Sequence, residues 1–133
     1  MGGFAQYIPP LLQGLGYTAL LVAISGAIGS VAGMLLGMAG TSPLLPARWV
    51  SNIYTNIIRG IPPLIILLFM YFALPILFPL FIFSKEVTAV IGLSVYAAAY
   101  IGEIVRGSIR AVPRGQNEAA EALGMSYYVK VRY

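Results

Sequence analysis

The sequence predicts an all-α membrane protein in which a single domain, residues 1–133, supplies three transmembrane helices. Apolar residues make up 59% of the chain and charged residues only 9%, a balance that is unlike a soluble globular domain. Apolar stretches over residues 15–39, 61–83 and 87–105 are bounded by short polar segments that hold the basic residues. Because a helix crosses a bilayer with about 20 apolar residues, each stretch is a candidate span, the second one with breaks.

The residue types that are missing exclude several classes of function. The chain has no histidine, cysteine or aspartate, which excludes a disulfide framework, a zinc site and a histidine- or cysteine-based catalytic group. The net charge of +4 could indicate nucleic acid, but the basic residues lie at the edges of the apolar stretches, as they do in cytoplasmic loops. We therefore expect no enzyme active site, no bound metal or cofactor and no nucleic-acid partner.

The first apolar stretch carries a ridge of small residues. Before it, Pro9 and Pro10 are expected to keep the uncharged residues 1–13 from continuing smoothly into a helix, on the outer surface. Within residues 15–39, every fourth position along one helix face is then small. We expect this face to pack closely against another helix, although glycine is also simply frequent in membrane helices. The positions are Ser25, Gly29, Gly33 and Gly37.

The second span is expected to be broken. Residues 47–58 predict an amphipathic helix at or near the inner membrane surface, because apolar residues recur at helical spacing and two asparagines share a neighbouring face. The apolar residues are Trp49, Ile53 and Ile57, and the asparagines are Asn52 and Asn56. Residues 59–63, Arg-Gly-Ile-Pro-Pro, then interrupt this helix. Either the break lines a transport pathway with freed backbone groups, or the two prolines simply start the next helix.

An acidic residue stands out in the third span. Residues 75–86 are expected to form an outer loop before this span begins at residue 87. Glu103 lies near the inner end of the span, where a carboxylate is costly and by default indicates a function. Arg106 follows three residues later and can pair with it on the helix surface. A structural ion pair is favoured, and contact with a substrate is the alternative.

The arginines and lysines predict the orientation of the chain. The segment before the first span has none, whereas Arg48 and Arg59 follow that span and five basic residues follow the third. The loop after the second span has only Lys85, beside Glu86. Because cytoplasmic loops are enriched in these residues, we expect the N-terminus outside and the last segment in the cytoplasm.

The last segment, residues 106–133, is the one long polar stretch. Residues 116–123 lack β-branched side chains and are rich in alanine, glutamate and leucine, which predicts a short helix. Gly124 suits the left-handed position that ends a helix, and Ser126 can cap a second short helix that runs toward Tyr133. A plainer interpretation is a solvated basic tail.

The triplet Glu118-Ala119-Ala120, followed after three residues by Gly124, resembles the cytoplasmic EAA loop of permease subunits in binding-protein-dependent ATP-binding-cassette (ABC) importers. The flanking residues, from about Thr18 onward, make the chain similar to the polar amino acid permeases. They are Arg59-Gly60-Ile61-Pro62, Tyr71-Phe72-Ala73-Leu74-Pro75, Ala99-Tyr100, Glu103, Arg106-Gly107, Ile109, Pro113, Gly115-Gln116 and Ala122-Leu123-Gly124-Met125-Ser126.

This resemblance implies part of the type I importer permease fold, in a bacterial inner membrane, with a coupling helix that docks into a cytoplasmic ATPase. ATP and magnesium would bind to that ATPase, a second permease subunit would complete the pathway, and an external solute-binding protein would deliver a polar amino acid. The residues implied for ATPase coupling are Arg114, Gln116, Glu118, Ala119, Ala120, Leu123 and Gly124. The residues considered for a substrate path are Arg59, Gly60, Pro62, Tyr100 and Glu103.

The chain departs from this family in length. The family's loop pattern usually continues from the ninth residue past the glycine, which here is Tyr133, the last residue. Members also typically have more spans than the three expected here. Three alternatives follow: a second chain supplies the missing spans, the chain is a truncated fragment that only binds the ATPase, or it is an unrelated membrane protein whose basic tail meets anionic lipid.

Overall fold

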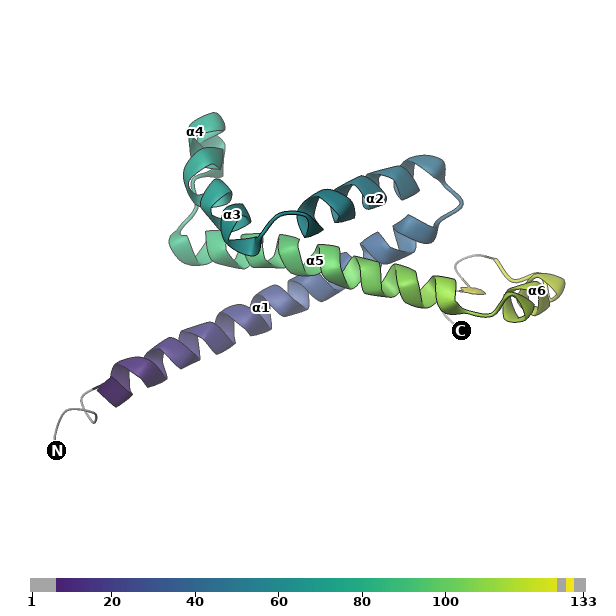
Figure 1. Cartoon of the computed structure of the whole chain (residues 1–133), viewed down its shortest axis with the longest axis horizontal. Helices are drawn as coiled ribbons and strands as arrows, with labels where there is room; N and C mark the ends of the chain where they lie inside the picture. Colours follow the sequence, from purple (N-terminus) through teal and green to yellow (C-terminus); the bar gives the residue numbers. More distant parts are fainter. Residues whose placement is uncertain (1–6, 127–128, 131–133) are drawn as a thin grey trace.

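The computed structural model describes residues 7–126 and 129–130, and these residues form helices and loops without a strand. The elements are α1 (Ile8–Thr41), α2 (Leu45–Arg59), α3 (Pro63–Leu68), the π-helical turn η2 (Phe69–Ala73), α4 (Leu74–Leu77), the 3-10 turn η3 (Pro79–Phe81), α5 (Lys85–Ala111) and α6 (Arg114–Ala122). In Figure 1 the long helices α1 and α5 cross, α2 lies beside α5, and α6 stands at the far end of α5. The predicted all-α class is confirmed.

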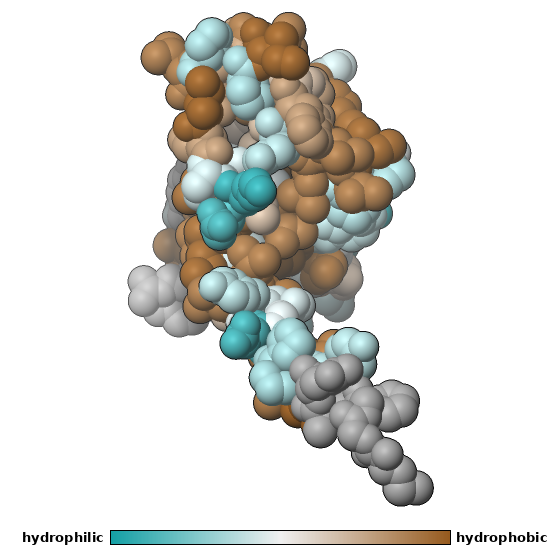
Figure 2. Space-filling model, turned by 90° about the vertical axis from the view of Figure 1, so that its left-hand side faces the viewer, coloured by the Kyte–Doolittle hydropathy of each residue, from teal (hydrophilic) through white to brown (hydrophobic). Residues whose placement is uncertain are grey.

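Two of the described helices, α1 with 34 residues and α5 with 27, are long and apolar enough to cross a membrane. α2 and the helical run Pro63–Leu77 pass the same test only as a pair, and a bend of 102° separates them. The described residues therefore hold two candidate spans, or three if the bent pair is one broken span. Hydrophobic residues cover most of the molecular face that Figure 2 shows, as expected of a surface in lipid.

α1 begins earlier than the sequence indicates. Tyr7 is its N-cap, so both Pro9 and Pro10 lie within its first turn, and the helix runs on to Thr41. The expectation that these prolines keep the chain out of a helix up to residue 13 is wrong. Proline is tolerated in a first turn, because the N–H groups there have no partner within the helix. Residues 1–6 lie outside the described part of the chain.

The core is a close contact between α1 and α5. A Cβ added to Gly29 would lie 2.6 Å from the Cβ of Ala97, and a Cβ on Gly33 would lie 2.9 Å from the carbonyl oxygen of Ala98. Carbon atoms pack no closer than about 3.5 Å, so the two backbones approach this far only because α1 lacks side chains here. The four predicted ridge positions are all buried in α1: Ser25, Gly29, Gly33 and Gly37.

α2 covers the amphipathic helix that was expected over residues 47–58. Pro46 lies in its first turn, and the helix ends at Arg59, with Gly60 as its C-cap. The buried residues of α2 are polar: Ser51 and Thr55. The hydroxyl of Ser51 donates to the carbonyl oxygen of Leu36 at 2.7 Å, which attaches α2 to α1.

The break after α2 agrees with the interpretation that the two prolines start the next helix, and a pathway lined by the break stays a prediction. The chain bends by 102° there, and Pro62 and Pro63 start α3 as N-cap and first residue. Beyond α3, the five residues of η2 are wound as a π-helix, and α4 continues to Leu77.

The loop that was expected over residues 75–86 is shorter at both ends. Residues 75–77 belong to α4, and α5 already begins at Lys85. Ser84 sets this start, because its hydroxyl accepts a hydrogen bond from the backbone N–H of Val87 at 3.3 Å. At its other end, α5 continues past the expected end of the span at residue 105 and reaches Ala111.

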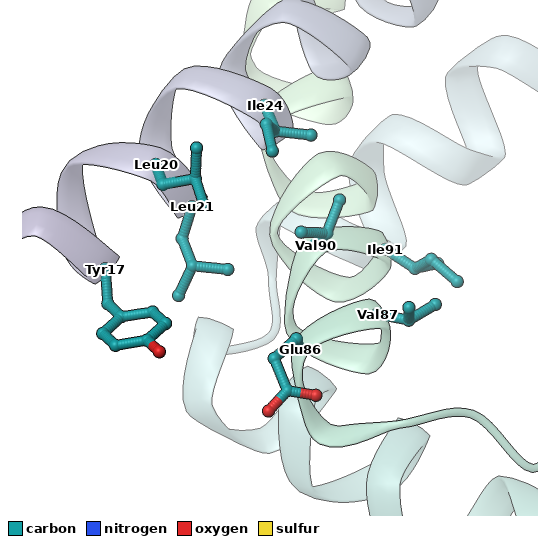
Figure 3. Close-up of a pocket in the computed structure, with 8 residues that line it drawn as sticks. All are labelled: Tyr17, Leu20, Leu21, Ile24, Glu86, Val87, Val90 and Ile91. Atoms are coloured by element: carbon teal, nitrogen blue, oxygen red, sulfur yellow. The ribbon is translucent and has the colours of Figure 1, made fainter.

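Near the start of α5, an apolar groove of about 250 Å³ separates it from α1 (Figure 3). The residues that line it are Tyr17, Leu20, Leu21 and Ile24 from α1, and Glu86, Val87, Val90 and Ile91 from α5. Only the Tyr17 hydroxyl and the Glu86 carboxylate are polar, so the groove offers apolar contact and no arrangement for catalysis.

Candidate coupling helix and intramembrane polar cluster

A group of polar side chains, which we call the polar cluster, joins α2 to the second half of α5. It comprises Asn52, Arg59, Tyr100, Glu103 and Arg106. Arg106 is 5% exposed, and its guanidinium donates to Oδ1 of Asn52 and to Oε2 of Glu103. The predicted ion pair between Glu103 and Arg106 is thereby confirmed. The sequence did not predict that Asn52 would complete it.

A second arginine reaches the same carboxylate. Nη1 of Arg59 lies 3.1 Å from Oε2 of Glu103, and the guanidinium carbon of Arg59 lies 5.4 Å from the centre of the Tyr100 ring. Because Arg59 is the last residue of α2, these contacts attach the break in the chain to α5. Two guanidinium groups around one carboxylate leave the polar cluster with a net charge of +1.

Arg106 can reach α2 because α1 has no side chain at Gly40. A Cβ on Gly40 would lie 3.2 Å from Cδ of Arg106 and 3.1 Å from Oγ of Ser51. The Nε of Arg106 is buried with no hydrogen-bond partner among the described residues. A buried donor without a partner costs about 1–3 kcal/mol, so the bonds to Asn52 and Glu103 are needed to keep this arginine in place.

Of the five residues considered for a substrate path, the structure brings three into contact: Arg59, Tyr100 and Glu103. Gly60 follows Arg59 directly, and Pro62 starts α3 beyond the break. One feature of the sequence pointed to Asn52: it lies one helical turn from Asn56 on an amphipathic helix. That spacing shows which side of α2 is polar, but not which helix that side meets.

α6 presents two alanines, a leucine and a glutamine on one side. Gln116, Ala119, Ala120 and Leu123 follow the spacing i, i+3, i+4, i+7, which lines one face of a helix. Leu123, the C-cap of α6, is 75% exposed. We call these four residues the α6 face. Glu118 lies on the opposite side of the helix, and Arg114 is the first residue of α6.

The turn that follows α6 depends on Gly124. Its φ is +71°, the left-handed conformation that its sequence context predicts and that side chains rarely adopt. The N–H of Gly124 donates to the carbonyl of Glu121 at 2.9 Å, and the N–H of Met125 donates to that of Ala120 at 3.0 Å. These bonds satisfy carbonyls at the end of α6 and set the direction in which the chain leaves it.

An ion pair holds the chain against α6 after this turn. Nζ of Lys130 lies 2.8 Å from Oε1 of Glu121. The hydrogen bond from Lys130, and then its positive charge, lower the pKa of the Glu121 carboxyl. The N–H of Lys130 also donates to the carbonyl of Ser126 at 2.9 Å. The rest of the second short helix expected toward Tyr133 lies outside the described residues.

The described residues contain no group of three or more histidine, cysteine or acidic side chains placed to hold a metal ion. What the geometry provides instead is an exposed helix at the end of a membrane helix, and a charged cluster between two helices.

Known proteins are similar to this chain in sequence. The "Probable amino-acid ABC transporter permease protein YckA" of Bacillus subtilis is 40% identical over 127 residues, which cover 96% of this chain and 55% of that protein. The arginine transport system permease protein ArtQ of the same organism is 40% identical over 120 residues, 90% of this chain and 54% of that protein. The glutamine transport system permease protein GlnP of Escherichia coli is 35% identical over 126 residues, which cover 95% of this chain and 58% of that protein. The chain thus spans about half the length of the curated relatives it matches.

A solved structure, described as "Crystal structure of an amino acid ABC transporter with histidines", matches with a TM-score of 0.84 and 34% identity over 97% of this chain and 59% of that one. The family model described as "Binding-protein-dependent transport system inner membrane component" matches residues 29–133, a range that includes the polar cluster and α6. This multi-pass membrane protein therefore belongs to the family of binding-protein-dependent transport system inner membrane components, among relatives that are amino acid ABC permeases.

Proposed function

We propose that this chain forms a membrane-spanning part of the permease of an ABC importer for amino acids, and that α6 is its contact with a cytoplasmic ATPase. The observation that carries the proposal is the α6 face, an exposed surface of low relief that directly follows a membrane helix. Ala119 and Ala120 allow another protein to approach the helix backbone closely, and the left-handed Gly124 fixes where the helix stops. ATP and magnesium would bind to the ATPase, and this chain would pass the motion to the membrane.

The topology and partners follow from this assignment. The N-terminus lies outside the inner membrane and α6 lies in the cytoplasm, as the distribution of arginine and lysine favours. The spans run over about residues 15–39, 61–83 and 87–105, the second one with breaks. A second permease subunit and an external solute-binding protein complete the importer. The relatives are named for different amino acids, so their names support an amino acid as the solute and not one particular amino acid.

We place the substrate path beside the break that follows α2. Arg59 and Glu103 are the open charged members of the polar cluster, with side chains 38% and 36% exposed, whereas Arg106 is buried. The bond between Arg59 and Glu103 uses part of a guanidinium that has five donors, so donors are left for the carboxylate of a passing amino acid. Gly60, Pro62 and Tyr100 adjoin this opening.

The coupling role is tested with Ala120→Glu in the complete transporter, reconstituted in vesicles with its ATPase and binding protein. A carboxylate at this position adds bulk and charge to the α6 face. Ala122→Glu makes the same change on the same helix, away from that face. The measured quantity is solute taken up for each ATP hydrolysed.

We expect Ala120→Glu to lower this ratio at least tenfold and to release the ATPase when the complex is purified. Ala122→Glu should keep at least half of the ratio. Equal coupling in the two variants, at equal protein levels, would remove α6 as the ATPase contact.

A further inference from the structure

The outer face of α2 is apolar and its inner face is polar, the reverse of a helix on a soluble protein. Ser51 and Thr55 are 2% and 1% exposed, whereas Trp49 and Ile53 are 65% and 51% exposed. With Val50 and Ile57, at 67% and 54%, they form a continuous stripe on one side of the helix, which we call the α2 stripe. Asn56 borders this stripe on the side of the polar cluster. A stripe of this kind is stable next to hydrocarbon and costly next to water.

The contacts of α2 show where it lies along α5. The hydroxyl of Tyr54 donates to the carbonyl oxygen of Val95 at 2.7 Å, and Arg106 donates to Asn52. At the end of α2, Arg59 contacts Glu103. α2 therefore lies beside residues 95–106 of a helix that is itself long and apolar enough to span a membrane. A helix at this level is within the bilayer and not outside it.

The length of α2 limits how far it extends. Its 15 residues are about 22 Å long, less than the hydrocarbon thickness of about 30 Å. Its first half is near the C-terminal ends of α1 and α5, through Ser51 with Leu36 and Asn52 with Arg106. Its last residue, Arg59, contacts Glu103 and Tyr100, which lie closer than Arg106 to the middle of α5, and Figure 1 shows α2 running in this direction. The helix therefore ends inside the membrane.

We propose that acyl chains of the leaflet at the C-terminal end of α5 cover the α2 stripe, and that α2 enters this leaflet on a slant. Trp49, beside Arg48, lies near the headgroups, where tryptophan and arginine are both favoured, and Ile57 lies deeper. The proposal rests on α5 crossing the membrane, but not on which side is cytoplasmic nor on any contact with an ATPase.

The consequence is that the break after α2 lies in the hydrocarbon layer. Backbone groups there need partners, because lipid supplies none. The N–H of Gly60 donates to the carbonyl of Ile57 at 3.1 Å, and the N–H of Ile61 donates to that of Ile58 at 3.3 Å. The charged end of α2 is likewise satisfied by Glu103 and Tyr100 and not by lipid.

The test uses a natural probe, since Trp49 is the only tryptophan of the chain. The full chain is reconstituted in phospholipid vesicles that carry bromine either near the glycerol end of the acyl chains or near their terminal methyl groups, and the quenching of fluorescence is compared. The same measurement is made on Trp49→Phe/Ile57→Trp, which moves the probe along the stripe, and on Trp49→Phe/Leu123→Trp, which moves it to α6.

We expect Trp49 in the unmodified chain to be quenched at least twofold more by the shallow bromines than by the deep ones. The Ile57→Trp probe should reverse this preference, and the Leu123→Trp probe should respond to aqueous iodide and to neither lipid. Two results would overturn the proposal. Absence of quenching by either lipid at Trp49 would show that protein covers the stripe. Quenching of both stripe probes by shallow bromines alone would show that α2 lies flat on the surface.

Failure of this proposal is distinguishable from failure of the proposed function. The fluorescence measurement requires neither ATPase nor substrate, and the coupling measurement at Ala120 does not depend on the depth of α2. The first arm uses the unmodified chain, so it gives a result even where a variant does not fold.

Discussion

α5 makes two contacts with opposite chemistry. Toward α1, small residues of α1 lie directly against the backbone and side chains of α5, and the buried serines of this contact bond within their own helices: Ser25 to Leu21 and Ser94 to Val90. Toward α2 the contact crosses between helices through directional bonds, from Arg106 to Asn52 and from Arg59 to Glu103. One contact is set by shape and the other by hydrogen bonds and charge.

The difference indicates which contact can change in a working transporter. Closely packed backbones cannot exchange one partner for another without separating. We therefore expect α1 and α5 to move as one body. The ion pair of Arg59 and Glu103 opens to the proposed substrate path, so it can exchange its partner for water or a ligand in that path at a cost of about 0–1 kcal/mol. We therefore expect α2 and the break after it to shift relative to a rigid α1–α5 pair.

The largest effect is expected from Gly33→Leu. A Cβ there would lie 2.7 Å from the Cβ of Ile101 and 2.9 Å from a backbone oxygen, so the helices would have to separate. The cost should exceed the roughly 1–3 kcal/mol that is typical of overpacking, and the thermal transition of the purified protein should be lost. Gly26→Leu is the matched control, because a Cβ at Gly26 meets nothing within 4 Å. Similar melting of both variants would contradict the rigid-pair interpretation.

The next effect is expected from Asn52→Leu. It removes an acceptor from the buried Arg106 guanidinium, which should destabilise the protein by about 1–3 kcal/mol. Asn56→Leu, one turn away on an exposed position, should change stability by less than half as much. Denaturant unfolding in detergent measures both. If the two variants are equally stable, Arg106 does not depend on α2.

A smaller effect on stability, but a large one on transport, is expected from Arg59→Gln. The ion pair with Glu103 opens to the proposed path, and Glu103 keeps Arg106 as a partner, so its loss should cost only about 0–1 kcal/mol. Uptake should nevertheless fall at least tenfold if Arg59 lines the path. Arg48→Gln removes a charge from the first turn of the same helix and should leave uptake nearly unchanged. Normal uptake in Arg59→Gln would restrict the polar cluster to a structural role.

The smallest effect concerns the ion pair between Glu121 and Lys130. The pKa of Glu121 is lowered from its ordinary 4.5 in the folded chain, so the pair stabilises the turn above that pH and is lost as the pH falls through the lower folded value. The protection of amides around Gly124 from hydrogen exchange, taken relative to the intrinsic rate at each pH, should therefore fall as the pH drops below 4.5 in the native chain. The Lys130→Ala variant should show this lower protection already at neutral pH. A pH response that is unchanged in Lys130→Ala would assign it to another group.

Local signals predicted much of this arrangement. The spacing of small residues located the face of α1 that meets α5, and Gly124 was correctly expected in the left-handed conformation. The pair of Glu103 and Arg106 was predictable because three residues separate them on one helix. Each of these inferences depends only on neighbours along the chain.

Contacts between helices were not predictable in this way. The bonds of Asn52 to Arg106 and of Arg59 to Glu103 join residues more than forty positions apart, and a helical period does not show which partner a face meets. The expectation that Pro9 and Pro10 exclude a helix was wrong for another reason. A proline breaks the interior of a helix but fits its first turn, and the sequence does not show which of these positions it occupies.

The π-helical turn at Phe69–Ala73 has a consequence for how the chain length can vary. Each residue of an α-helix advances the chain by about 100°, so one residue more or less turns everything beyond it by that angle. A π-helical turn closes its hydrogen bond over one residue more than an α-helical turn does, so it holds an extra residue without turning the helix beyond it. A lineage that deleted one residue from this turn would rewind it as α-helix, and Leu74–Leu77 would keep the same side toward the rest of the molecule. Single-residue gaps in this stretch are therefore smaller structural events than the same gaps in α1 or α5.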